Sequence, residues 1–204
     1  MFKVSRRRAL FLAALLILTT SAAFAASPIQ TPEWTTLTPP GEGFSVNLPM
    51  KPEIESQRVP VMGNSYQLRL YTASEKTTGL VYMVVMQEFP SVSGAPTPAV
   101  RLEKFMNGFK QGLGESLATA AGSKVDLVFD RDANLGANLG RHYLLAIGET
   151  RGLIRVFDGG RRVYLLMALG ADEKNSSVSR FLDSFEIKTA PDPVPQPLVD
   201  TKSP

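Results

Sequence analysis

The segment from Arg141 to Gly170 constrains the fold most strongly, because its pattern predicts three β-strands in a meander. The last of these strands, Arg162 to Leu169, is almost wholly apolar. A strand that is apolar on both sides is typical of a central position in a sheet whose two faces are both covered. A layer of helix on each side of the sheet would provide that cover.

The two last strands of the meander are joined by the sequence Asp-Gly-Gly-Arg at 158–161. A glycine pair between two β-rich runs predicts a two-residue turn, because both central positions of such a turn favour positive φ. If the two glycines form the turn, Ile154 lies opposite Leu165 and Arg155 lies opposite Tyr164.

The beginning of the chain has the features of an export signal. Four basic residues precede an uncharged apolar run at 9–18, and an A-x-A site ends at Ala25. The run is shorter than the roughly 20 residues of a membrane span, so cleavage after Ala25 is favoured over an uncleaved anchor. Residues 5–11 also resemble a twin-arginine signal, although ordinary Sec export fits better. We therefore expect a periplasmic or secreted protein with no membrane span after cleavage.

Removal of the signal changes the charge. The chain holds 22 Lys and Arg against 19 Asp and Glu, and four of the basic residues lie in the first 25, which leaves 18 − 19 = −1. No basic excess remains to indicate nucleic acid as a partner. An envelope protein or a small anionic ligand is the expected partner. The chain has no cysteine, which excludes disulfides, a thiol nucleophile and a lipid-bearing cysteine.

Residues 26–188 are long enough and apolar enough to form one domain with its own core. Residues 189–204 contain five prolines and few apolar residues, which predicts a disordered, extended tail.

Two helices are expected. Thr97 and Pro98 have the residue types of an N-cap and a first helical position, and one apolar stripe follows them: Leu102, Phe105, Met106, Phe109 and Leu113. Gly112 and Gly114 should loosen or end this helix. A second stripe, which begins near Asp172 or Asn175, consists of Val178, Phe181, Leu182 and Phe185. The order strands, helix, strands, helix predicts an α+β domain with a mostly antiparallel sheet flanked by helices on both faces, an α/β/α sandwich.

Several short segments resemble a group of uncharacterised exported bacterial proteins. They are Trp34, residues 43–49 with Lys51 and Pro52, the Gly140-Arg141 pair, and residues 181–185. That group is similar in layout to the PsbP-like fold, an α/β/α sandwich that also occurs in a small nuclear-import factor. The resemblance covers nearly the whole domain and implies a binding or assembly role without catalysis. It supplies no site residue.

The sequence offers few catalytic motifs. His142 is the only histidine, so a site with several histidines is excluded. No G-x-S-x-G string and no glycine-rich phosphate loop between strand and helix occurs. A Ser-His-Asp triad assembled from distant residues stays open as the lesser alternative. We expect no cofactor, no metal and no catalytic residue.

Asp130, Asp132 and Asn134 alternate as calcium ligands do, with Gly136 after them. The glycine stands one position too late, and the twelfth position is Arg141 rather than Glu. A polar hairpin or crossover loop is therefore the favoured interpretation.

The sharpest site hypothesis is a row of side chains across three strands. If the loop at Gly148 and Glu149 has two residues, His142, Arg155 and Tyr164 lie side by side across the three strands. They could then bind an anion or a carboxylate, with the guanidinium of Arg155 as the bidentate donor and the other two as hydrogen-bonding groups. A three-residue loop would replace His142 by Tyr143. The simpler alternative, which we favour, is that Arg155 stacks on Tyr164 without a ligand.

Two classes of function follow. The favoured one is an exported binding or assembly module that is not an enzyme. The other is a hydrolase with a carboxylate-based or Ser/His-based site that no motif reveals. A deep pocket with convergent polar groups would indicate the enzyme, and a shallow apolar patch would indicate the module.

Overall fold

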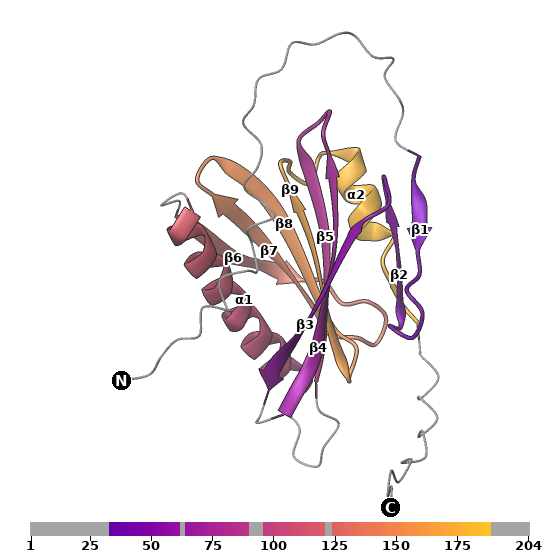
Figure 1. Cartoon of the computed structure of the whole chain (residues 1–204), viewed down its shortest axis with the longest axis vertical. Coiled ribbons are helices and arrows are strands. Elements are labelled where there is room, and N and C mark those ends of the chain that lie inside the picture. The colour runs from indigo at the N-terminus through magenta and orange to yellow at the C-terminus, as the bar shows by residue number, and fades with distance from the viewer. Residues whose placement is uncertain (1–32, 62–63, 90–95, 121–123, 189–204) are drawn as a thin grey trace, which may run out of the picture.

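A computed structural model describes residues 33–61, 64–89, 96–120 and 124–188, and its elements are shown in Figure 1. Seven antiparallel strands form the main sheet in the order β3-β4-β5-β9-β8-β7-β6. In chain order they are β3 (Glu53–Val61), β4 (Asn64–Glu75), β5 (Leu80–Glu88), β6 (Val125–Asp132), β7 (Gly140–Ile147), β8 (Thr150–Asp158) and β9 (Arg162–Leu169). A smaller sheet has the order β1-β2-β10, with β1 (Thr35–Leu37), β2 (Phe44–Leu48) and β10 (Glu186–Ile187).

The apolar strand β9 lies in the middle of the main sheet, as its sequence predicts. All of its residues after Arg162 are buried, and its side chains alternate between two separate hydrophobic clusters, one on each face. Helix α1 (Pro98–Ala120) covers one face, and helix α2 (Ser176–Asp183) covers the other together with β2 (Figure 1). The expected α+β architecture, a mostly antiparallel sheet with helices on both faces, is confirmed.

The α1 face is mainly aliphatic. The stripe of α1 packs on it as predicted, with Leu102, Phe105, Met106 and Leu113 buried and Phe109 partly buried. The carbonyl of Thr97 accepts from Arg101 N at 2.9 Å, which places Thr97 at the start of the helix. The expectation that Gly112 and Gly114 end α1 is wrong, because the helix continues to Ala120.

Helix α2 is capped by Asn175, one of the two residues that the sequence left open. Its side-chain oxygen accepts from the backbone N–H groups of Ser177 and Val178, which satisfies two donors at the helix start. The helix ends at Asp183, so Phe185 packs on the same cluster from beyond the helix.

The turn between β8 and β9 differs from the prediction. Gly159 N donates to Arg162 O at 2.8 Å, and Gly160 and Arg161 form the turn. Of the two glycines at 159 and 160, Gly160 alone has a positive φ, of 82°. Gly159 has a different reason to be glycine, since a Cβ there would lie 2.7 Å from Cε2 of Tyr164. The register therefore moves by two residues, which keeps every side chain on its expected face but changes its partner.

The expected export signal, its cleavage after Ala25 and the expected proline-rich tail at 189–204 lie outside the described residues. Within the described parts of the chain, no helix combines the length and the apolar character needed to cross a membrane.

Candidate functional site

His142 and Arg155 are neighbours on the β7–β8 hairpin. The loop at Gly148 and Glu149 has two residues, because Ile147 pairs with Thr150, and His142 then lies directly opposite Arg155. Both side chains project to the face covered by α2. This part of the predicted row is present in the structure.

Tyr164 does not belong to the row. The two-residue change of register places Leu166 opposite Arg155, and Tyr164 lies opposite Phe157. The hydroxyl of Tyr164 donates to the backbone oxygen of Glu42 at 2.8 Å, and burial raises the pKa of this phenol. The expected stacking of Arg155 on Tyr164 is replaced by an ion pair, in which Arg155 Nη1 donates to Asp183 Oδ1 at 2.7 Å.

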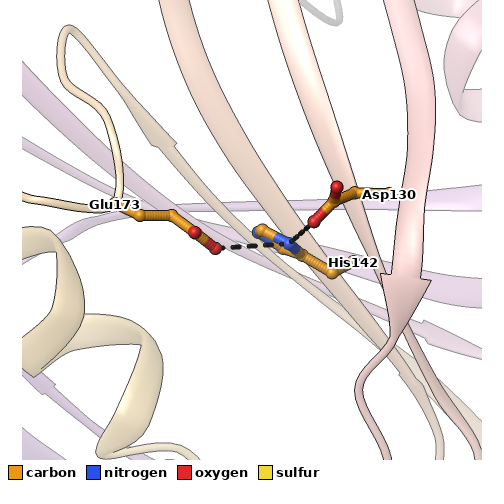
Figure 2. Close-up of side chains that lie close together, drawn as sticks. All are labelled: Asp130, His142 and Glu173. Carbon is orange, nitrogen blue, oxygen red and sulfur yellow. Dashed lines mark hydrogen bonds and ion pairs between the residues drawn. The ribbon is translucent and has the colours of Figure 1, made fainter.

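His142 forms the centre of a polar cluster with two carboxylates (Figure 2). Its Nδ1 lies 3.1 Å from Asp130 Oδ2 and 3.4 Å from Glu173 Oε1. Asp130 is the extra residue of a β-bulge between Phe129 and Arg131, and this bulge turns its carboxylate toward His142. Glu173 comes from the loop between β9 and α2, so the cluster joins three separate parts of the chain.

Arg131 contacts the same two carboxylate oxygens as His142 does. Its Nη1 donates to Asp130 Oδ2, and its Nη2 donates to Glu173 Oε1. The Nδ1 of His142 and these two oxygens lie within 4.8 Å of one another. The side chains of Asp130, His142 and Glu173 could therefore hold a metal ion, to which each would supply one ligand atom. The guanidinium of Arg131 already neutralises one of the two negative charges there. A cation would therefore compete with Arg131.

The imidazole of His142 is poorly suited to acid–base catalysis. Its side chain is 0% exposed, and Nε2 makes no hydrogen bond among the described residues. Burial lowers the pKa of His142, against the opposing effect of Asp130. A neutral ring with its proton on Nδ1 donates to Asp130, and Glu173 of the β9–α2 loop lies 3.4 Å from the same nitrogen. Because the ring is fully buried, a substrate cannot reach it without a rearrangement of the residues around it.

A half-open pocket of about 310 Å³ lies beside the cluster and includes Arg155. It is lined by the β6–β7 hairpin, by β8 and by the C-terminal end of α2: Ala133, Asn134, Leu135, Arg155, Phe157, Leu182, Asp183 and Phe185. The rings of Phe157 and Phe185 stack with their centroids 5.5 Å apart. Five apolar residues line this pocket together with Asn134, Arg155 and Asp183. Such a mixed lining suits a small ligand that has an apolar body and a charged group.

The β6–β7 connection has the form of a polar hairpin, which is the interpretation the sequence favoured over calcium. Asn134 Oδ1 accepts from Gly140 N at 3.0 Å, and Leu135 pairs with Asn138. Asp130 faces His142 and Arg131 rather than the loop.

Sequence reasoning missed the parts that Arg131, Glu173 and Asp183 play in this region. Asp183 lies in the segment 181–185, whose resemblance supplied no site residue, and Arg131 and Glu173 belong to no motif. Arg131 reaches the site beside the β-bulge, Glu173 through the β9–α2 loop and Asp183 at the end of α2. The single available signal was that His142 and Arg155 both interrupt otherwise apolar strands.

Similarity to known proteins is found among solved structures and not among family models or curated sequences. No family model and no curated protein matches the sequence. Among solved structures, the chain is similar to that of the cyanobacterial PsbP protein (CyanoP) from Synechocystis sp. PCC 6803, with 12% identity and a TM-score of 0.45. The match covers 80% of this chain and 98% of the other.

Proposed function

We propose that this protein is an exported binding module without catalytic activity, and that the pocket beside Arg155 takes a small ligand with a carboxylate and an apolar part. The observation that supports it most is the composition of the pocket, whose lining combines one guanidinium, that of Arg155, with aromatic and aliphatic residues. Export rests on the signal features of residues 1–25.

Arg155 is the group that recognises the carboxylate. Its side chain is 22% exposed, so its donors are partly desolvated and can still be reached from the pocket. A planar guanidinium binds a carboxylate through two parallel N–H···O bonds, which fixes the orientation of the ligand.

Asp183 acts as an internal competitor. Its carboxylate accepts from Arg155 at 2.7 Å but is 62% exposed, so it can turn into water when a ligand carboxylate takes its place. Exposed ion pairs contribute little to stability, typically about 0–1 kcal/mol, and their exchange is therefore inexpensive. The apolar part of the ligand would then lie against Phe157, Leu182 and Phe185.

Isothermal titration calorimetry with 3-phenylpropionate tests the proposal. Arg155→Gln should abolish binding, because the guanidinium that binds the ligand carboxylate is lost. Asp183→Asn should strengthen binding several-fold, because the carboxylate that competes with the ligand for Arg155 is lost. Arg151→Gln is the matched control, since Arg151 is an exposed arginine of the same strand, four residues away, and outside the pocket lining. The uncharged amide of the same acid should not bind. Equal binding by the wild type and Arg155→Gln would contradict the proposal.

A further inference from the structure

The two edge strands of the main sheet differ in the faces on which they expose large apolar side chains. Both expose charged residues, which discourage pairing with another chain: Glu53, Glu55 and Arg58 on β3, and Asp126, Arg131 and Asp132 on β6. Strand β3 also exposes Ile54 at 59%, on one face of the sheet. The other edge strand, β6, exposes Val128 on one face of the sheet and Phe129 on the other, at 57% and 52%. A partner that covers both faces of an edge at once is an added strand.

We propose that β6 pairs antiparallel with β6 of a second copy of this chain across a twofold axis, so that two seven-stranded sheets become one. The added strand would satisfy the outward backbone N–H and C=O groups of β6 and cover apolar side chains on both faces. The second copy is favoured as the partner by the charges along β6. Among the registers that place both Val128 and Phe129 opposite residues 124–132, one alone brings opposite charges together without like charges opposed.

Symmetry limits the registers that are possible. Opposite residues of an antiparallel pair project to the same face, and the side chains alternate along each strand. A twofold axis between two identical strands must therefore place one residue directly opposite its own copy. The axis cannot lie midway between two residues that are adjacent in the sequence. If that residue is Asp126, its carboxylate faces its own copy. If it is Val128, Asp126 faces Asp130 twice, and if it is Phe129, Asp126 faces Asp132 twice. Like charges directly opposite one another are destabilising.

The register centred on Leu127 has the opposite character. It places Lys124 opposite Asp130 at both ends of the paired segment. The side chain of Lys124 is 82% exposed and pairs with Asp126 at 3.0 Å, and that of Asp130 is 31% exposed and contacts Arg131 and His142. On association, the exposed Lys124 would exchange Asp126 for Asp130 of the second copy, which needs a change of side-chain rotamer and no change of fold. The β-bulge after Phe129 ends the regular part of β6 at this point.

Packing agrees with this register. Val125 would lie opposite Phe129, and Leu127 opposite its own copy, all on the face covered by α1. Val125 and Leu127 already pack partly against the hydrophobic cluster under α1. The second copy would extend that cluster across the axis and cover the exposed ring of Phe129.

Cross-linking tests the register directly, because the chain has no cysteine of its own. A Leu127→Cys variant places two thiols opposite each other across the axis, where directly opposite Cβ atoms lie about 4.5–5.5 Å apart. Mild oxidation should convert most of the variant to a covalent dimer. The Ile54→Cys variant, at a 59% exposed position on β3, is the control and should stay monomeric. Equal cross-linking of both variants, or none of Leu127→Cys, would overturn the proposal.

Sedimentation equilibrium gives an independent measurement that does not depend on a half-buried position. The purified protein should associate to twice its chain mass with rising concentration. Lys124→Glu should raise the dissociation constant about tenfold by turning two attractions into repulsions, and Phe129→Lys should abolish association. Ile54→Lys should have no effect. A single-chain mass at concentrations up to about 1 mM, or loss of the dimer in Ile54→Lys alone, would contradict the proposal.

Discussion

The two faces of the main sheet are closed in different ways. On the α1 face, one long helix lies over a mainly aliphatic cluster. On the α2 face, short pieces from both ends of the domain lie over seven buried aromatic residues: Phe44, Tyr71, Tyr82, Phe157, Tyr164, Phe181 and Phe185. The α2 face also carries His142, Arg155 and the pocket. The face that is assembled from short pieces is thus the one that accommodates polar groups and a cavity.

The buried polar groups of the two faces differ as well. At the edge of the α1 face, Arg101 makes a two-pronged ion pair with Asp158, with N···O distances of 2.6 and 2.8 Å. The α2 face holds Glu42, which accepts from Tyr71 at 2.6 Å and from Arg69. Burial and the neighbouring Glu42 raise the pKa of Tyr71. The pair on the α1 face extends to Pro96 O, which accepts from Arg101, and to Gly160 N, which donates to Asp158, so each face holds a polar network that joins a helix or strand to a loop.

Removal of a central ring should have the largest effect. Phe44 is 0% exposed and contacts the rings of Tyr71, Tyr164 and Phe185 with centroids 5.6–5.8 Å apart. Phe44→Ala should lower the free energy of unfolding by about 3–5 kcal/mol in urea denaturation, and Leu102→Ala on the α1 face should lower it by about 2–5 kcal/mol. A loss below about 1 kcal/mol for Phe44→Ala would show that the aromatic cluster does not hold the α2 face together.

Breaking the ion pair of the α1 face should have the next largest effect. The side chain of Asp158 is 3% exposed, so Arg101→Met leaves a buried carboxylate with the N–H of Gly160 but without a neutralising cation, and should cost about 3 kcal/mol. The double variant Arg101→Met/Asp158→Asn should recover much of that loss. Urea denaturation of the two variants tests this, and equal stability of the single and double variants would contradict it.

His142 should make the stability of the α2 face depend on pH. Burial lowers its pKa below the ordinary value of 6.5. As the pH falls below 6.5, His142 is therefore protonated in the unfolded chain more than in the folded protein, and this stabilises the unfolded state. The contribution of His142 to the stability of the folded protein is thus present above pH 6.5 and decreases as the pH falls below it. His142→Asn should remove the contribution, which has a slope of at most about 1.4 kcal/mol per pH unit. Superimposable stability curves of the two proteins between pH 7 and pH 5 would contradict it.

The smallest effect is expected at the surface of the His142 cluster. The side chain of Glu173 is 45% exposed, so water screens its ion pair with Arg131. Glu173→Gln should change the free energy of unfolding by less than about 1 kcal/mol in the same denaturation experiment. A loss near 3 kcal/mol would mean that the β9–α2 loop depends on this carboxylate more than its exposure indicates.

The same contrast separates what the sequence could predict from what it could not. The stripe of α1 and the all-apolar strand β9 follow from patterns within about 25 residues, and both were predicted. The glycine turn gave the correct faces but a register two residues out, because Gly159 makes room for the ring of Tyr164 rather than forming the turn. The partners of His142 and Arg155 come from a bulge and from loops far along the chain, and no local pattern encodes such contacts.

A titration of the ¹⁵N-labelled protein with 3-phenylpropionate, followed by backbone amide chemical shifts, tests the central claim most directly. If the pocket beside Arg155 binds the ligand, the changes concentrate at residues 133–135, 155–157 and 182–185 and disappear in Arg155→Gln. Changes centred elsewhere, or no changes at millimolar ligand, would contradict the claim that the α2 face carries the binding site.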